Sequence, residues 1–315
     1  MTTDNILVSI IIVNYNGKHF LDDCLSSIKK LVSVPYEIII VDNASSDGSC
    51  DYIKTSWPDI KLVESKENSG FTGGNNLGVS QARGALLFLV NNDTKLLSDI
   101  KVACNMFSVD PNLGVVGGRL YYGDGRQQFS IGLEHSPLRI ILSWAGAKKV
   151  KMLPSLFRRE ILDEESYTLP HDSVSWVSGA CLITRRALWQ KLHGLDEQYF
   201  MYVEDVDYCK RVRLAGYRVA YTPGLQIVHY EGAGKAWVGD MALARSLRSY
   251  LIYTEKFYGP FAALFLRFGL SLIFFLRALA YRARLTISKS DIVLDKCKAS
   301  WNVSMKLLFN RLNKL

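Results

Sequence analysis

The chain has 315 residues, 49% hydrophobic and 22% charged, which is ordinary for a globular protein of one large domain or two modest ones. Its net charge of +8 is concentrated at one end: residues 256–315 hold 11 Lys/Arg and 2 Asp/Glu, and the other 255 residues hold 27 basic and 28 acidic groups. This nearly neutral body argues against a nucleic-acid-binding protein, which would carry positive charge across its fold.

Six scattered cysteines include no C-x-x-C pair, which argues against a disulfide framework or a zinc site and favours a reducing compartment. Residues 1–5 lack the basic start of a signal peptide, and the apolar run after them is too short to cross a membrane. We therefore expect a cytoplasmic chain.

The first 95 residues alternate strand and helix patterns. Apolar, β-branched runs predict strands at 6–13, 37–41, 60–63 and 85–90. Apolar residues spaced by three and four predict a helix over 21–31, Asp47 is the predicted N-cap of a second helix, and 73–76 begins a third, which Gly84 ends. This alternation predicts a mostly parallel, Rossmann-like central sheet flanked by helices.

Beyond residue 95 the pattern loosens. We predict strands at 115–120, 176–183, 217–221 and 225–229, and helices at 185–192 and 204–214. Residues 121–173 show no clear periodicity and are predicted to be mostly loop. No G-x-G-x-x-G follows the first strand, which disfavours a dinucleotide-dependent dehydrogenase.

The segment Asn91-Asn92-Asp93-Thr94 directly follows a buried strand. A carboxylate among amides at this edge of an α/β sheet offers hard oxygen ligands, which suit Mg²⁺ or Mn²⁺ carrying substrate phosphates. The alternative is a simple turn, in which Asn and Asp are common. We expect Asp93 to bind the metal.

Two further segments favour a nucleotide site. Asp42 follows the second strand, where its carboxylate could accept from a pyrimidine N–H or a ribose hydroxyl; Asp47 is better explained as a turn and capping residue. The glycine-rich run from Asn68 to Asn76 precedes a helix, and backbone N–H groups there favour an anionic sugar phosphate. A tight turn that needs positive φ is the alternative for this run.

A cluster of acids, Glu204-Asp205-Val206-Asp207, follows an aromatic run. Neighbouring carboxylates and apolar walls both raise pKa values, so one of these groups could take a proton from a sugar hydroxyl near neutral pH. The alternative is an acidic first turn that the helix dipole stabilises. We assign the base role to Asp205, with Glu204 in reserve and Asp207 structural.

His229 ends an apolar strand before a Gly-Ala-Gly segment. A neutral imidazole there could complete the metal shell or contact a diphosphate oxygen, although a lone histidine is more often structural.

Taken together, these motifs resemble a known family. SIIIVNYNG (9–17), VDNASSDGS (41–49), ENSGFTGGNN (67–76) and NNDT (91–94) resemble, in this order, the signatures of glycosyltransferase family 2, whose members are inverting, metal-dependent enzymes of GT-A fold. WVSGA (176–180), GLDE (194–197), YVEDVD (202–207) and His229 are similar to its bacterial rhamnosyltransferase-like branch.

The resemblance implies a role for each matching position. Asp93 would hold Mg²⁺ or Mn²⁺ with His229, and Asp205 would be the catalytic base. The nucleotide-sugar would be bound by a larger set: Val13, Asn14, Tyr15, Asp42, Asn68, Gly74, Asn75, Asn92 and Asp93. The chain keeps one carboxylate of the family's D-x-D motif, so the metal would also rely on the donor diphosphate.

The implied organisation is a nucleotide-sugar-binding half at 1–95, an acceptor-binding and catalytic-base half at 96–240, and a helical extension at 241–315. Residues 261–281 are apolar but contain Arg267 and Arg277, so a helix lying at an interface is favoured over a membrane span. Basic residues follow, which favours peripheral attachment to an anionic membrane; packing on the body or in a homo-oligomer is the alternative.

The leading hypothesis is an inverting glycosyltransferase of bacterial cell-surface polysaccharide or O-antigen synthesis. It would use dTDP-rhamnose and a glycan or lipid-linked glycan acceptor, on the inner face of the cytoplasmic membrane. A UDP-glucose or UDP-galactose transferase is the alternative within the class. A sugar-nucleotide pyrophosphorylase is disfavoured because no Gly-rich loop with Arg and Lys follows the first strand. The remaining alternative is an inactive sugar-nucleotide-binding or membrane-scaffold module.

Overall fold

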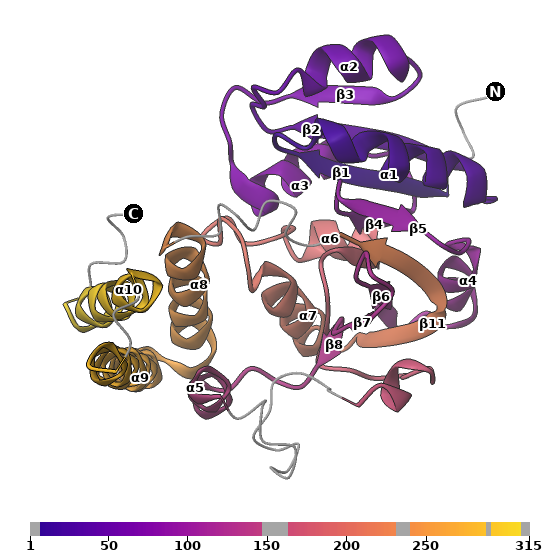
Figure 1. Ribbon diagram of the computed structural model, residues 1–315. Helices are drawn as coiled ribbons and strands as arrows, with labels where there is room; N and C mark the ends of the chain where they lie inside the picture. The colour runs from indigo at the N-terminus through magenta and orange to yellow at the C-terminus, as the bar shows by residue number, and fades with distance from the viewer. Residues whose placement is uncertain (1–6, 147–162, 231–239, 288–290, 310–315) are drawn as a thin grey trace. The chain divides into compact units, whose positions relative to one another are not determined.

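The computed structural model describes residues 7–146, 163–230, 240–287 and 291–309, which fall into two compact units (Figure 1). The first unit contains residues 7–133 and 163–230, and the second contains 134–146, 240–287 and 291–309. The second unit thus includes residues 134–146 as well as the C-terminal extension.

The first unit is built on a sheet with the strand order β3-β2-β1-β4-β10-β6-β11-β5, with β7 paired to β6. The strands of this sheet are β1 Val8–Asn14, β2 Tyr36–Asp42, β3 Lys61–Glu64, β4 Leu86–Val90, β5 Thr94–Leu96, β6 Leu113–Tyr121, β7 Gln127–Gln128, β10 Cys181–Arg185 and β11 Arg218–His229. Strands β3, β2, β1 and β4 are parallel, β10 is antiparallel to both β4 and β6, and β5 is antiparallel to β11. Strands β8 Ile131–Gly132 and β9 Trp176–Val177 form a small second sheet.

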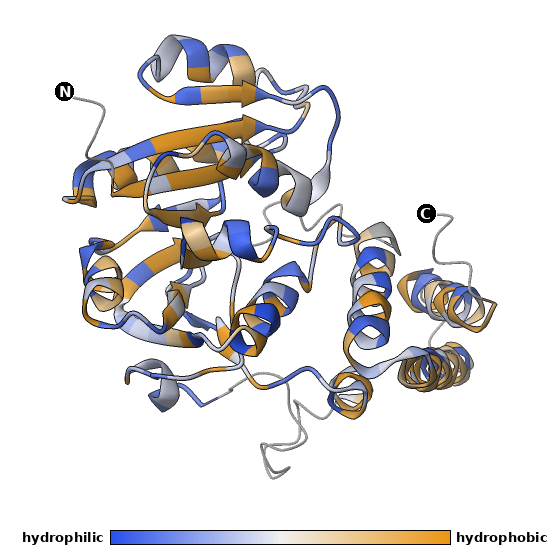
Figure 2. Cartoon of the chain, turned by 180° about the vertical axis from the view of Figure 1, so that it is seen from behind, coloured by the Kyte–Doolittle hydropathy of each residue, from blue (hydrophilic) through white to orange (hydrophobic). Residues whose placement is uncertain are grey.

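Helices cover both faces of this sheet. The helices of the first unit are α1 Lys18–Leu31, α2 Ser49–Ser56, α3 Gly70–Ser80, α4 Lys101–Val109, α6 Arg186–Lys191 and α7 Glu204–Leu214, with a 3₁₀ turn at Glu165–Tyr167. Side chains alternate along β1, so Ile10 and Ile12 share a core with the buried face of α1, whereas Ile11 meets α3. In Figure 2 the central strands are mostly orange, the colour of hydrophobic residues.

The second unit consists of α5 Pro137–Ala145, α8 Asp240–Tyr258, α9 Pro260–Leu285 and α10 Asp291–Leu308. The hydroxyls of Tyr253 and Tyr258 both donate to Glu134 Oε1, at 3.0 and 3.2 Å. On α9 and α10, Ser271 and Ser304 hydrogen-bond reciprocally, each hydroxyl lying 2.9–3.0 Å from the other's carbonyl oxygen. The serine pair thus links α9 to α10, and the two tyrosines link α8 to the segment just before α5.

The α/β fold with a mostly parallel half is as the sequence predicts, but several elements differ. Residues 176–183 form two strands rather than one, because a turn at Ser178 separates β9 from β10. The two predicted last strands are one strand, β11, whose register shifts between Thr222 and Gln226 around a Pro-Gly pair. The sequence also failed to predict the strands β5, β7 and β8 and the helices α4 and α5. Part of the segment predicted to be loop, 147–162, lies outside the described residues.

Candidate active site

The carboxyl ends of β1, β2 and β4 are joined by a network of side chains. Asn14 Nδ2 donates to Asp42 Oδ2 at 2.9 Å, and Asn92 Nδ2 donates to Asn14 Oδ1 at 2.8 Å. A Cβ on Gly17 would lie 2.0 Å from Asn92 Nδ2, so this close approach requires glycine. Three predicted nucleotide-site residues, Asn14, Asp42 and Asn92, are therefore in one hydrogen-bonded row.

Asp42 and Tyr15 differ sharply in accessibility. Asp42 is 1% exposed, and its second oxygen accepts from the backbone N–H of Ser45 at 2.8 Å. Tyr15 is 51% exposed, so its ring is free to stack on a nucleobase. Asp42 thus positions the amides around it, and its direct contact with a nucleoside stays a prediction.

The glycine-rich run begins α3 three residues earlier than predicted. Gly70 has φ +73°, and a Cβ there would lie 2.1 Å from the carbonyl oxygen of Phe200, which also accepts from Phe71 N–H at 3.0 Å. Asn68 Oδ1 accepts from Gly70 N–H at 2.9 Å and from Asn43 Nδ2 at 3.1 Å. The run therefore ties the end of β2 to the segment that precedes α7.

Gly74 and Asn75 have packing roles in α3. A Cβ on Gly74 would lie 2.6 Å from Val13 Cγ1, and Asn75 Nδ2 donates to the carbonyl oxygen of Phe71 at 2.8 Å. Asn75 is only 1% exposed. These contacts explain the residue types by packing, and the predicted sugar-nucleotide contacts of Val13, Gly74 and Asn75 stay predictions.

Asp93 and His229 are brought together by the pairing of β5 with β11, which places His229 opposite Thr94. His229 Nε2 lies 3.3 Å from Asp93 Oδ1 and 3.1 Å from Asn91 Nδ2, and its Nδ1 lies 3.0 Å from Gln128 Oε1. If Nδ1 donates to Gln128, Nε2 carries the lone pair and faces Asp93. This is the tautomer that a metal-binding histidine needs.

The residues around Asp93 fit a divalent cation. Within the described parts of the chain no three His, Cys, Asp or Glu side chains cluster as a metal site, so Asp93 and His229 form only a pair. Asn91 Oδ1 is a candidate third donor, since it is buried without a hydrogen-bond partner among these residues and its side chain contacts His229. Two oxygens and one imidazole nitrogen suit Mn²⁺ or Mg²⁺ that is also bound by a diphosphate.

Gln128 should control metal affinity without touching the metal. We expect Gln128→Leu to weaken Mn²⁺ binding about 10–100-fold, because it releases the His229 ring and leaves Nδ1–H without its acceptor. Titration calorimetry with Mn²⁺ measures the effect. Gln127→Leu, one residue away on the same strand, is the control, and equal Mn²⁺ affinity in the two variants would contradict the positioning role.

The acidic cluster forms the first turn of α7, and its three acids have different surroundings. Asp205 is half-buried and accepts from the N–H groups of Gly179 and Val206, both at 2.8 Å. Asp207 is fully buried and paired with Arg211 Nε at 2.6 Å, which fits its predicted structural role. Glu204 is 6% exposed, and its Oε2 has no hydrogen-bond partner among the described residues.

The backbone before α7 is strained. Tyr202 and Val203 have φ values of +72° and +70°, a left-handed conformation that non-glycine residues rarely adopt and that costs roughly 1–3 kcal/mol per residue. Asn16 and Ala44, just beyond the ends of β1 and β2, also have positive φ. Such strain is concentrated at functional sites, which favours a catalytic role for the residues that follow Val203.

Burial raises the pKa of Glu204 well above its ordinary value of 4.5, and the neighbouring Asp205 charge raises it further. The folded state therefore binds a proton that the unfolded state releases, so stability falls as pH rises from about 4.5 through the raised pKa. We expect Glu204→Gln to remove this fall. Urea unfolding at several pH values checks it, and parallel pH curves for the two proteins would contradict it.

The metal pair and the acidic cluster lie at the same edge of the sheet. Strand β10 is antiparallel to β4 and its first residue, Cys181, pairs with Val90, so the residues just before Cys181 lie beside the segment that begins at Asn91. One of them is Gly179, whose N–H donates to Asp205. Adjacent strands are about 4.8 Å apart. The sequence motif around Gly179 is thus explained: it holds Asp205 next to the end of β4. Gln128, Asn91 and Gly179 were not predicted as site residues.

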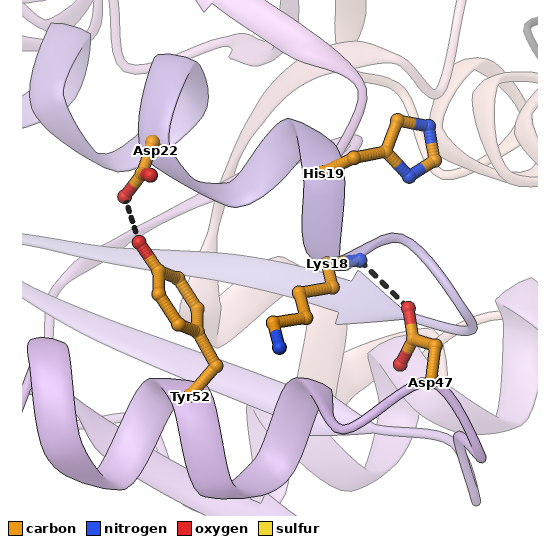
Figure 3. A pocket seen from close by; sticks show the side chains of 5 residues that line it. All are labelled: Lys18, His19, Asp22, Asp47 and Tyr52. Carbon is orange, nitrogen blue, oxygen red and sulfur yellow. Dashed lines mark hydrogen bonds between the residues drawn. The ribbon is translucent and has the colours of Figure 1, made fainter.

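A recess of about 410 Å³ lies between the N-terminal ends of α1 and α2 (Figure 3). Its lining is Lys18, His19, Asp22, Asp47 and Tyr52. Asp47 Oδ2 accepts from Lys18 N–H at 2.9 Å and Asp47 Oδ1 from Ser49 N–H at 3.1 Å. Asp47 therefore supports the start of α2, although Gly48 occupies the N-cap position itself.

Comparison with known proteins identifies the family. The model of the family "Glycosyl transferase family 2" matches residues 9–189, more than half of the chain. A Sinorhizobium fredii protein, y4gI, is 26% identical over 96% of this chain, which spans 31% of that protein's length. The N-acetylglucosaminyl-diphospho-decaprenol L-rhamnosyltransferase of Mycobacterium tuberculosis is 24% identical over 71% of this chain and 76% of its own.

Among solved structures, the mannosyltransferase PcManGT of Pyrobaculum calidifontis, in complex with GDP-Man and Mn²⁺, matches with a TM-score of 0.54 and 15% identity. The match covers 98% of this chain and 88% of that one, and it confirms the expected GT-A fold. The ordered motifs, the fold and the family match agree. The chain belongs to glycosyl transferase family 2 and resembles that family's rhamnosyltransferase-like branch.

Proposed function

We propose that this protein transfers a sugar from a nucleotide donor to a hydroxyl of a glycan or lipid-linked glycan, with inversion at the anomeric carbon. The observation that carries the proposal is the placement of Asp205 at the same sheet edge as the Asp93–His229 pair. A proton acceptor and a site for a diphosphate-bound cation are the two parts that such a transfer needs.

The donor nucleotide would bind along the row formed by Asn14, Asp42 and Asn92, with Tyr15 stacked on the base. The exposed ring of Tyr15 and the amides held by Asp42 support this placement. Asn68 would position the sugar-phosphate end from the loop before α3. The diphosphate would then lie near Asp93.

Asp205 would accept the proton of the acceptor hydroxyl while the hydroxyl oxygen attacks the anomeric carbon. The bond between that carbon and the diphosphate oxygen breaks, and the nucleoside diphosphate leaves with the bonding electrons. A divalent cation held by Asp93, His229 and Asn91 Oδ1 would supply Lewis-acid stabilisation of the leaving diphosphate. One carboxylate suffices, since the leaving group needs no protonation, in contrast to the carboxylate pair of glycoside hydrolases.

The favoured donor is dTDP-rhamnose, and the favoured setting is bacterial cell-surface polysaccharide or O-antigen assembly at the inner face of the cytoplasmic membrane. The name of the mycobacterial relative, a rhamnosyltransferase acting on a decaprenol-linked sugar, supports rhamnose as the transferred sugar and a lipid-linked acceptor. UDP-glucose or UDP-galactose is the alternative donor.

A panel of nucleotide-sugars tests the donor assignment. The purified protein with Mn²⁺ should release nucleoside diphosphate fastest from dTDP-rhamnose, and NMR of the transferred product should show the anomeric configuration opposite to that of the donor. Faster release from a UDP-hexose would overturn the donor assignment alone. Retention of configuration would overturn the single-displacement mechanism.

A further inference from the structure

One face of α9 carries a row of exposed apolar side chains. Its members are 43–87% exposed: Phe261, Leu264, Phe265, Phe268, Leu272, Leu276 and Leu279. At 3.6 residues per turn these positions fall within a sector of about 120°, and the row is about 27 Å long. We call this row the α9 stripe. Soluble monomers rarely expose so continuous an apolar surface without a binding function.

The charged residues of α9 do not interrupt the stripe. Arg277 donates to the carbonyl oxygen of Trp144 on α5 and lies 5.3 Å from the centre of the Phe274 ring. Arg267 Nε is buried, so this side chain lies on the inward side of the helix. The two arginines that argued against a membrane span thus lie off the stripe, whose own face stays uncharged from Phe261 to Leu279.

The opposite face of α9 is fixed to its own unit. Leu266, Leu270 and Phe274 are at most 3% exposed, and Gly269 lies against Ile141 of α5. Within the described chain α9 is the one helix with the length and composition to cross a membrane, yet this packing covers one of its sides. A helix held along one face and apolar along the other is suited to lie in the plane of a bilayer surface.

Basic and aromatic residues beside the α9 stripe indicate which kind of partner would bind it. Arg282 and Arg284 are exposed just beyond its end, and Lys296 and Lys298 are exposed on α10. The Trp301 ring of α10 is 45% exposed and lies 5.8 Å from Phe275, at the margin of the stripe. Tryptophan and basic side chains beside an apolar face are typical of interfacial helices on anionic membranes. Asp291 and Asp295 are the only acids in residues 256–315.

We propose that the α9 stripe is a docking surface for an anionic lipid bilayer, with α9 lying in the membrane plane and its basic end against lipid phosphates. The surface holds the protein at the leaflet where a lipid-linked acceptor would present its sugar. The inference goes beyond the transferase activity and does not depend on it, because membrane binding is measured without donor or acceptor.

Flotation of the full-length protein with vesicles tests the proposal. The protein should float with vesicles of equal parts phosphatidylcholine and phosphatidylglycerol and much less with pure phosphatidylcholine. A variant with Phe265→Ser, Phe268→Ser and Leu272→Ser should lose at least about tenfold in partitioning. Each of Arg282→Gln and Arg284→Gln should lose about fivefold at low salt.

The matched control removes exposed apolar side chains from the first unit: Val109→Ser with Leu214→Ser, at positions 83% and 71% exposed. Equal flotation of the control and the stripe variant would overturn the proposal. Concentration-dependent dimerisation that the stripe variant abolishes, with no flotation of the wild type, would overturn it in favour of a second copy. Because donor hydrolysis in solution is assayed separately, the failure of either idea is visible without the other.

Discussion

Asp205→Asn should lower kcat for sugar transfer by about 10²–10⁴-fold while leaving donor affinity nearly unchanged. The amide preserves the shape that the Gly179 and Val206 N–H groups hold, but it cannot take the proton of the acceptor hydroxyl. Burial also raises the Asp205 pKa above its ordinary 3.8. Activity should therefore fall as pH drops through that raised pKa, since the base works only when ionised.

Glu204→Gln is the matched control for this experiment. Burial and the neighbouring Asp205 keep the proton on Glu204 to higher pH, and glutamine has nearly the shape of the protonated acid. We expect this variant to retain kcat within a few-fold. If Glu204→Gln loses activity and Asp205→Asn keeps it, the base is Glu204 and the assignment of the two residues is reversed.

Asp93→Ala should remove most metal-dependent activity, by about 10³-fold, because it deletes the one carboxylate beside His229. Mn²⁺ affinity measured by calorimetry should also fall in Asp93→Ala. The fall should be larger without nucleoside diphosphate, because the diphosphate also binds the cation. The two measurements together separate a lost cation from a misfolded site.

Asp124→Ala serves as the control for Asp93→Ala. Asp124 is an exposed carboxylate paired with Arg126 on a surface turn, and its removal should change neither Mn²⁺ affinity nor turnover. Full turnover and unchanged Mn²⁺ affinity in Asp93→Ala would refute the metal assignment.

The regular elements of the first unit were predictable because their signals are local. The apolar run that forms β4 and the spaced apolar residues of α1 read directly as a buried strand and an amphipathic helix. The single strand β11 was missed because its Pro-Gly pair resembles a turn, and only the neighbouring β6 shows that the chain continues through a bulge. The two residues of β7 are too short to produce any periodic signal.

The candidate site residues could be proposed from the sequence where an acid or a histidine stands at the end of a strand or the start of a helix, and not where the partner is distant. Asp93, His229 and Asp205 stand at recognisable positions in the sequence. Gln128 lies in a segment without periodicity, and its role depends on a contact with His229, 101 residues away. Gly179 is similar: its N–H contact with Asp205 exists only once β10 has paired with β4.

For the apolar C-terminal segment, the sequence predicts a helix but not which residues lie on its exposed face. The sequence revealed its composition and its two arginines, but not the side of the helix on which they lie. The structure shows that both arginines point away from the exposed apolar face: Arg277 contacts Trp144, and Arg267 Nε is buried. The α9 stripe is therefore not interrupted by charge. The positions of these arginines therefore favour a helix at the membrane surface over a membrane span, and the flotation experiment tests this.

We propose that Asp205, beside a cation held at Asp93, drives the transfer of a sugar from a nucleotide donor to a hydroxyl acceptor. The most direct measurement follows a radiolabelled sugar from the nucleotide to a lipid-linked glycan, with wild type, Asp93→Ala and Asp205→Asn, in Mn²⁺ and in EDTA. We predict labelled product only for wild type in Mn²⁺. Equal transfer by wild type in EDTA would contradict the role of the cation, and equal transfer by Asp205→Asn in Mn²⁺ would contradict the role of Asp205 as the base.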